Sequence, residues 1–397
     1  MSERVSSGFH VDEDIVVEPD DWLDAMAGGD RQRILDTIRG LGLREVQRFP
    51  PPREGSMPFG HELRVLGRFV RGGNSLFDPS GFAGVYRALA SARQRLLFRA
   101  FIVSDPLSEA EWKQILGAAE LALWRDRRLL RVAGDGLSCR LVCCPVGRVL
   151  LLGDAKKPVK LLRRVIIGQD SFNMVRLMDG QEIPASGGRY LDVGPGSGVV
   201  LLNYAGRFRE AVGIDINPRA VIISRLSAEL NDIPNCRVFE DDAVANGKRY
   251  GPFDLVSWNT PFVFLPEECR DTHLDAFGGH LGLELPLRFV GQLPELLTER
   301  GRSCLLMSAP ILRSGENVLE RELGRLAREL SLDIVNHVVQ SYWHALYREF
   351  HESHGIAKNE LVFLVIRRGR GRLERVEPSL GTRLSGRVRE LAYRIRR

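Results

Sequence analysis

The chain has 397 residues, of which 44% are hydrophobic and 27% are charged, and its formal net charge is +5. This length exceeds the size at which one hydrophobic core usually stops growing, so two domains are expected. No apolar run approaches the about 20 residues that span a bilayer, and the acidic start of the chain differs from a secretion signal, which predicts a cytoplasmic protein without membrane contact. The six cysteines form no Cys-x-x-Cys pair, so they are expected to be reduced and no metal site is expected.

The first part of the chain is predicted to be helical and to end in short strands. Residues 1–20 are acidic and poor in aromatic residues, which predicts a disordered tail. Helical periodicity follows over 30–43, 60–71 and 82–101, and from Ser108 to about Trp124. Short strands joined by tight turns are then expected at 128–132, 138–144 and 147–152. Helices followed by a small β wing resemble a winged-helix module, so residues 21–155 are predicted to form a domain for substrate recognition or dimerisation.

Strands and helices alternate in the second part of the chain. Strands are expected at 189–193, 210–215, 237–239, 253–258, 303–308, 332–339 and 360–367. This alternation predicts an α/β domain over residues 156–370, with a Rossmann-like, doubly wound sheet of seven strands. The basic segment 371–397 is predicted to be a helix or a tail, and its arginines are suited to contact phosphates.

A glycine-rich turn follows the first predicted strand of this domain. Asp192 precedes the turn, which contains Gly194, Pro195, Gly196, Ser197 and Gly198. Glycine lets a ligand lie against the backbone and adopts positive φ angles without strain. The next strand ends in Asp215, about twenty residues after the glycines, which is the position of a carboxylate that binds both ribose hydroxyls. A nucleoside site is therefore predicted. An NAD-dependent enzyme would have the same glycine turn and the same carboxylate.

Later motifs separate these alternatives. Asp215 continues as Asp-Ile-Asn-Pro-Arg-Ala, the third strand is followed by Glu240-Asp241-Asp242-Ala243, and the fourth ends in Asn259-Thr260-Pro261-Phe262. In these motifs the chain resembles the class I methyltransferases that depend on S-adenosyl-L-methionine (AdoMet), in particular the branch of the release-factor glutamine and small-domain ribosomal RNA guanine methyltransferases. The resemblance covers about residues 163–368. It implies AdoMet as cofactor and S-adenosyl-L-homocysteine as product.

The resemblance also implies a cofactor role for particular residues. The loop 192–198 would hold the methionine part, Asp215 and Ile216 the ribose side, and Asp242 with the Ala243 backbone the adenine. Asp241 competes with Asp242 for that role. A segment before the first strand resembles the one that closes over the cofactor in relatives, which adds Gln169 and Ser171 as candidates, and Asn259 at the end of the fourth strand is a further one.

The acceptor end is expected at Asn259, Pro261 and Phe262, the predicted catalytic residues. Relatives carry Asn-Pro-Pro-Tyr/Phe there, where the asparagine oxygen and a proline carbonyl bind an NH2 group and the aromatic ring stacks on a planar acceptor. Thr260 departs from this pattern, which leaves the acceptor open. The glycine-rich stretch 277–283 matches the same branch. Candidate substrate-binding residues are Phe262, Glu267, Glu268, Glu284, Tyr342 and Trp343.

These observations predict an N-methyltransferase acting on a planar nitrogen of a small amino-acid-like or natural-product acceptor. Alternatives are a ribosomal RNA base or a protein glutamine as acceptor, and, from another class, a winged-helix DNA-binding regulator that senses AdoMet. A homodimer is among the expected assemblies. Four histidines recur at near-heptad spacing: His337, His344, His351 and His354. This spacing favours an amphipathic helix that acts as a lid on the acceptor pocket, rather than a metal site.

Overall fold

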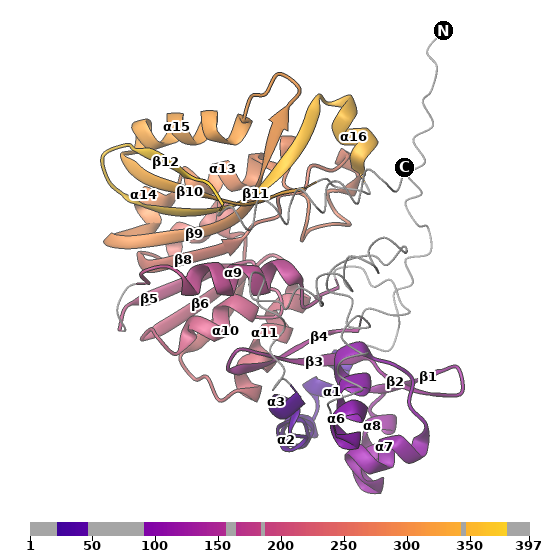
Figure 1. Cartoon of the computed structure of the whole chain (residues 1–397). Coiled ribbons are helices and arrows are strands. Elements are labelled where there is room, and N and C mark those ends of the chain that lie inside the picture. The colour runs from indigo at the N-terminus through magenta and orange to yellow at the C-terminus, as the bar shows by residue number, and fades with distance from the viewer. Residues whose placement is uncertain (1–21, 47–90, 156–163, 184–186, 343–346, 379–397) are drawn as a thin grey trace.

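The computed structural model describes residues 22–46, 91–155, 164–183, 187–342 and 347–378 (Figure 1). The predicted tail at 1–20 and the predicted helix at 60–71 lie outside them. Within these ranges no helix is both long enough and apolar enough to cross a membrane.

A sheet of eight strands forms the centre of the second part of the chain (Figure 1). Its strand order is β12-β10-β11-β9-β8-β5-β6-β7. Strand β11 is antiparallel to both of its neighbours, and the other pairs are parallel. The strands are β5 (Arg189–Val193), β6 (Glu210–Asp215), β7 (Cys236–Glu240), β8 (Phe253–Asn259), β9 (Leu297–Leu312), β10 (Leu332–Tyr342), β11 (Ile356–Arg368) and β12 (Leu373–Val376). The predicted Rossmann-like fold is confirmed.

Alternation along the strands gives the sheet two apolar faces. Tyr190 and Leu255 belong to one core, which includes residues of α9 (Gln169–Asp179), α10 (Val199–Ala205) and α11 (Pro218–Leu230). Leu191 and Val256, one position along, belong to a second core. That core is covered by α12 (Ala243–Asn246), α13 (Glu284–Val290), α14 (Leu293–Leu296) and α15 (Val318–Leu330). Helices on both faces explain why these strands are apolar on both sides.

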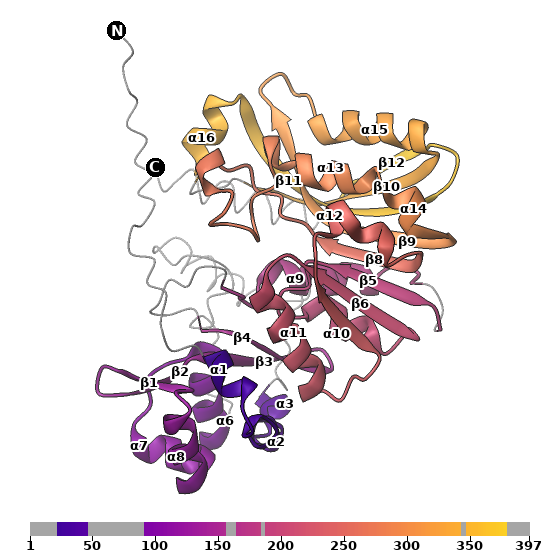
Figure 2. The same ribbon diagram turned by 180° about the vertical axis from the view of Figure 1, so that it is seen from behind.

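The N-terminal region lies beside the sheet domain (Figure 2). Its helices are α1 (Trp22–Ala27), α2 (Arg31–Gly40), α3 (Leu43–Val46), α6 (Ala92–Leu97), the π-helix Phe98–Val103, α7 (Glu109–Leu116) and α8 (Ala118–Asp126). Two hairpins follow, β1 (Leu130–Ala133) with β2 (Gly136–Cys139) and β3 (Leu141–Val146) with β4 (Val149–Asp154). Ser108 and Glu111 form a capping box that starts α7, and Gly117, at a φ of 78°, separates α7 from α8. The winged-helix assignment stays a prediction.

Helix α11 is shared between the N-terminal region and the sheet domain. Its Val221 and Ala228 pack into the core under the sheet. Its other face packs into the N-terminal core through Ala220, Ile223, Leu226 and Leu230. Two faces of α11 are buried, and this explains why both carry apolar residues.

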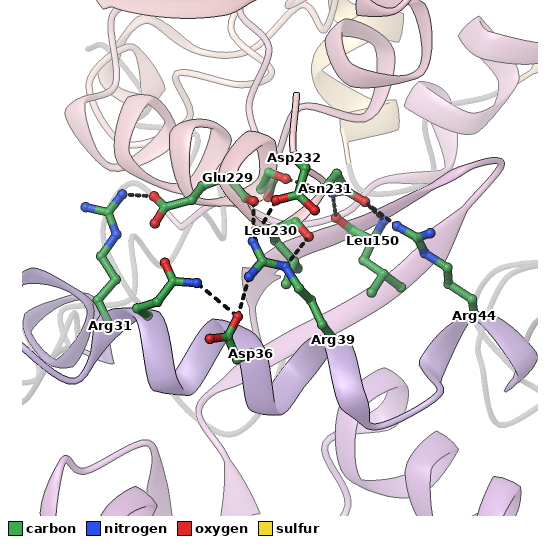
Figure 3. A network of polar contacts seen from close by, with 11 residues as sticks. Arg31, Asp36, Arg39, Arg44, Leu150, Glu229, Leu230, Asn231 and Asp232 are labelled. Atoms are coloured by element: carbon green, nitrogen blue, oxygen red, sulfur yellow. Dashed lines mark hydrogen bonds and ion pairs between the residues drawn. The ribbon is translucent and has the colours of Figure 1, made fainter. Parts of the chain in front are cut away.

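Polar contacts fasten the end of α11 to α2 and β4 (Figure 3). Arg39 of α2 donates to the carbonyl oxygens of Glu229 and Leu230, at 2.6 and 3.0 Å. These carbonyls lie at the C-terminus of the helix, where a cation is favourable. Asn231 pairs with the backbone N–H and C=O of Leu150 on β4, at 2.8 and 2.6 Å. The N-terminal region is thus fixed against the sheet domain.

The C-terminal part differs from its prediction in two places. Strand β12 lies inside the segment from 371 for which a helix or tail was predicted, and it extends the sheet to eight strands. The histidine spacing predicted one helix, but His337 and Tyr342 lie on strand β10. Helix α16 (Arg348–Ser353) is short and carries His351, while Trp343 and His344 lie outside the described residues. The prediction of one helix was wrong because strand β10 continues for four residues past Val338, beyond a β-bulge, into the region where the helix was expected.

Candidate functional site

Three strand ends meet at one edge of the sheet. Strand β5 lies between β6 and β8, and all three are parallel. Their carboxyl ends are Val193, Asp215 and Asn259. Ligands of open α/β sheets bind at this edge, so the topology places the predicted cofactor acid and the predicted acceptor asparagine on either side of the glycine turn.

The glycine turn has the backbone conformation that its sequence predicts. Gly194, Gly196 and Gly198 have φ angles of 58°, 57° and 86°. The carboxylate of Asp215 accepts a hydrogen bond from the Gly196 N–H at 3.0 Å and another from the Asn217 N–H at 2.9 Å. Asp215 therefore fixes the turn, and since a carboxylate has about four acceptor positions, two remain for a ligand. Pro195 and Ser197 are buried.

Asp192 lies beneath this turn in a buried chain of polar groups. The Ser257 hydroxyl donates to Asp192 Oδ1 at 2.5 Å, so the Tyr190 hydroxyl, 2.6 Å from Ser257 Oγ, must donate to Ser257. Burial raises the pKa of Asp192 to about 7, although the hydrogen bond from Ser257 opposes the shift. Sequence reasoning missed Ser257 and Tyr190, and the signal for them is a polar group on an otherwise apolar strand.

The two acids after β7 have different surroundings. Asp241 accepts hydrogen bonds from Asn246 Nδ2 at 2.7 Å and from the Tyr250 hydroxyl at 2.8 Å, and the bond from Asn246 lowers its pKa most. Asp242 is exposed and caps α12 through one oxygen, Oδ1. The second oxygen of Asp242 has no hydrogen-bond partner among the described residues, so Asp242 suits the adenine better than Asp241. Ala243 follows it and is buried.

Apolar surface next to these acids completes the predicted nucleoside site. Ile216, directly after Asp215, is 49% exposed, which is high for a large apolar side chain. A Cβ on Gly213 would lie 2.9 Å from Leu201, so the middle of β6 requires glycine for close packing.

Asn259 carries a buried polar atom that lacks a partner. Its Oδ1 is buried and has no hydrogen-bond partner among the described residues. Its Nδ2 lies 3.4 Å from Ser171 Oγ on α9, which brings the segment before β5 to the end of β8. The side chain of Gln169 lies outside the described residues. A buried acceptor without a donor costs about 1–3 kcal/mol, which is expected where a ligand supplies the donor.

Thr260 anchors the loop that follows. Its hydroxyl and its backbone N–H both donate to the Leu306 carbonyl on β9, at 3.0 and 3.1 Å. Proline could make neither bond, so the departure from the family motif fixes the loop by a different contact. Pro261 and Phe262 are partly exposed.

The predicted glycine-rich stretch packs directly on this loop. A Cβ on Gly278 would lie 2.4 Å from the Pro261 carbonyl oxygen, and one on Gly282 would lie 2.2 Å from that of Phe262. Glycine is needed here because two backbones are in contact.

The other predicted substrate-binding residues are less closely gathered. Glu267 is exposed and paired with Arg270 at 2.5 Å, and Glu268 is exposed beside it. Glu284 is exposed at the start of α13, with Oε2 3.4 Å from the His280 N–H. Tyr342 donates to Ser308 Oγ at 2.9 Å. Among the described residues, no hydrogen bond or ion pair joins these side chains to Asn259. Their substrate role therefore stays a prediction. Within the described ranges, no group of three or more metal-ligating side chains is gathered.

Comparison with known families agrees with this geometry. Residues 191–281, from β5 to the glycine-rich stretch, match the family model described as "Methyltransferase domain". The chain thus carries a methyltransferase domain in this range. Its cofactor is AdoMet, and the methyltransferase domain is consistent with the positive-φ glycines, the two acids at the strand ends, exposed Ile216 and the orphan Asn259 Oδ1.

Two curated relatives match part of the chain. A protein named "putative protein N5-glutamine methyltransferase" from Methanocaldococcus jannaschii is 35% identical over 123 residues, which is 30% of this chain and 61% of the relative. An uncharacterized protein of Bacillus subtilis, YbxB, is 36% identical over 92 residues, 23% of this chain and 46% of the relative. The chain thus spans about half the length of the curated relatives it matches.

Solved structures also align with the chain. The ribosomal protein L11 methylase of Lactobacillus delbrueckii subsp. bulgaricus has 17% identity and a TM-score of 0.34, covering 54% of this chain and 90% of its own. M. jannaschii TYW2 in complex with AdoMet has 13% identity and a TM-score of 0.37, covering 58% and 90%.

The affinity for AdoMet should fall as the pH falls through about 7. Burial raises the pKa of Asp192 to about 7, so this carboxyl is ionised above that pH and neutral below it. An anion under the turn attracts the cationic cofactor, and protonation removes the attraction. We expect binding about three- to tenfold weaker at pH 6 than at pH 8, with proton release on binding near neutral pH. Calorimetry in two buffers of different ionisation enthalpy measures both. Asp192→Asn should flatten the dependence, and tighter binding at low pH would contradict the assignment.

Proposed function

We propose that this chain transfers the methyl group of AdoMet to a planar nitrogen, most simply an amide NH2. The observation that carries the proposal is the buried Oδ1 of Asn259 at the end of β8, which has no partner among the residues that the structure describes. This oxygen can accept a hydrogen bond from the incoming NH2 group, which directs the nitrogen lone pair toward the cofactor site beyond β5. Positioning of this kind is the main contribution that a transfer from an activated sulfonium requires, and the acceptor proton can leave to water.

The surroundings of Asn259 indicate what kind of molecule would accept the methyl group. The neighbouring ring of Phe262 is partly exposed and suits a flat acceptor. A small amino-acid-like or natural-product acceptor remains our first candidate. A protein glutamine side chain is the second, because a relative is named as a protein N5-glutamine methyltransferase. Both present a planar amide or similar nitrogen, so both fit the same asparagine.

Labelled AdoMet sorts these candidates directly. The protein is incubated with label and with separate small-molecule, protein and RNA pools from a lysate. We expect label on nitrogen in the small-molecule or the protein pool, and label in RNA alone would overturn both acceptors. A protein that binds AdoMet by calorimetry but labels no pool would instead support a sensing role. For RNA, a steep dependence of binding on salt would show phosphate contacts.

A further inference from the structure

A chain of polar side chains connects the far strands of the sheet to the predicted acceptor loop. The Tyr342 hydroxyl lies 2.9 Å from Ser308 Oγ, which lies 3.3 Å from Asn359 Oδ1. Asn359 Nδ2 lies 3.4 Å from His351 Nδ1, and His351 Nε2 lies 2.8 Å from the Phe264 carbonyl oxygen. Ser308, Asn359 and His351 are all buried. The chain therefore crosses β10, β9, β11 and α16 before it reaches the loop after β8.

The direction of these hydrogen bonds fixes the state of the imidazole. The Phe264 carbonyl can only accept, so His351 Nε2 must carry a proton. His351 Nδ1 faces an amide NH2, so it must be the acceptor and carry none. Each group in the chain then donates to the next, from Tyr342 to Phe264. A neutral His351 with the proton on Nε2 satisfies both of these hydrogen bonds.

The surroundings of His351 agree with a neutral ring. Burial lowers the pKa of His351, although the bond to the Phe264 carbonyl opposes the shift. His354, directly after the helix, also lowers it, and both His354 and His280 lie against the Phe264 ring. The charged groups nearby are already paired, as Arg348 with Glu352 on α16 and as Lys358 and Arg375 with Glu360 on β11.

The loop that His351 contacts is also held by backbone hydrogen bonds to residues 276–278. The Val263 N–H donates to the Ala276 carbonyl at 2.8 Å, and the Gly278 N–H donates to the Val263 carbonyl at 3.1 Å. Phe264 is the next residue, and its carbonyl oxygen is the one that His351 contacts. We propose that His351 is a positioning residue that holds the Asn259–Phe264 loop in the geometry for methyl transfer; this inference rests on the proposed function.

The test compares His351→Ala, His351→Gln and the matched control Glu349→Ala, an exposed residue of the same helix. We expect His351→Ala to speed amide exchange in residues 259–264 about tenfold and to lower kcat about ten- to a hundredfold, with AdoMet affinity within about twofold. Glutamine can still donate to the Phe264 carbonyl, so His351→Gln should recover most of both. Glu349→Ala should match the wild type.

Two results would overturn the inference. One is unchanged exchange and kcat in His351→Ala, and the other is equal damage in His351→Gln. If His351→Ala does not fold, nitrogen NMR of the wild type decides, because the proton must lie on Nε2 and a proton on Nδ1 contradicts the contact. If the wild type transfers no methyl group, the proposed function fails, but the exchange and NMR results still test the role of His351.

Discussion

Asn259→Ala should lower methyl transfer by at least about a hundredfold while AdoMet affinity stays within about twofold. The alanine removes the oxygen that is buried without a partner, and no other described atom of the chain depends on it. An acceptor that is no longer aimed loses the benefit of orientation, which is worth about two orders of magnitude for a displacement of about 1 Å. Single-turnover rates and calorimetry measure the two quantities separately.

A conservative variant sharpens this test. Asn259→Asp keeps an oxygen in place and should lose less activity than the alanine. Equal rates in the wild type and in Asn259→Ala would exclude the asparagine from the reaction. If the wild type itself has no turnover in any pool but binds an operator sequence, the regulator is favoured, because sensing does not require Asn259.

Arg219→Met should lower the free energy of unfolding by about 3–5 kcal/mol. Arg219 lies four residues after Asp215 and forms two contacts with the buried Asp154, at 2.5 and 2.8 Å. The same carboxylate accepts bonds from Trp22 Nε1 and from the Val165 N–H, both at 2.8 Å. Removal of the arginine leaves a charge that is 1% exposed without its cation, and this is the costly outcome.

Urea unfolding of three variants checks the explanation. The double variant Arg219→Met/Asp154→Asn should recover part of the loss, since no unpaired charge remains. Arg31→Ala removes an ion pair with Glu229 that is partly exposed on both sides, so its cost should not exceed about 1 kcal/mol. A loss in Arg219→Met no larger than that of Arg31→Ala would show that the buried pair adds little.

The sequence predicted the sheet well because its strands are short, buried and separated by turn residues. Strands β5 and β6 have the predicted bounds. The glycine turn and Asn259 were predicted because each belongs to a continuous motif. The contacts that support them were not, because they join residues far apart in the chain: Ser257 to Asp192 across 65 positions, His351 to Phe264 across 87, and Trp22 to Asp154 across 132. No local pattern records such pairs.

Helix α11 makes the protein difficult to divide. A fragment that begins near residue 164 would present Ile223, Leu226 and Leu230 to water as an apolar stripe, and such a stripe promotes aggregation. Transplanting the N-terminal region onto a different catalytic domain would likewise fail unless this stripe and the arginine contact at the end of the helix travelled with it. An exchange of domains during evolution would therefore have to keep α11 together with both the N-terminal region and the sheet that it packs against.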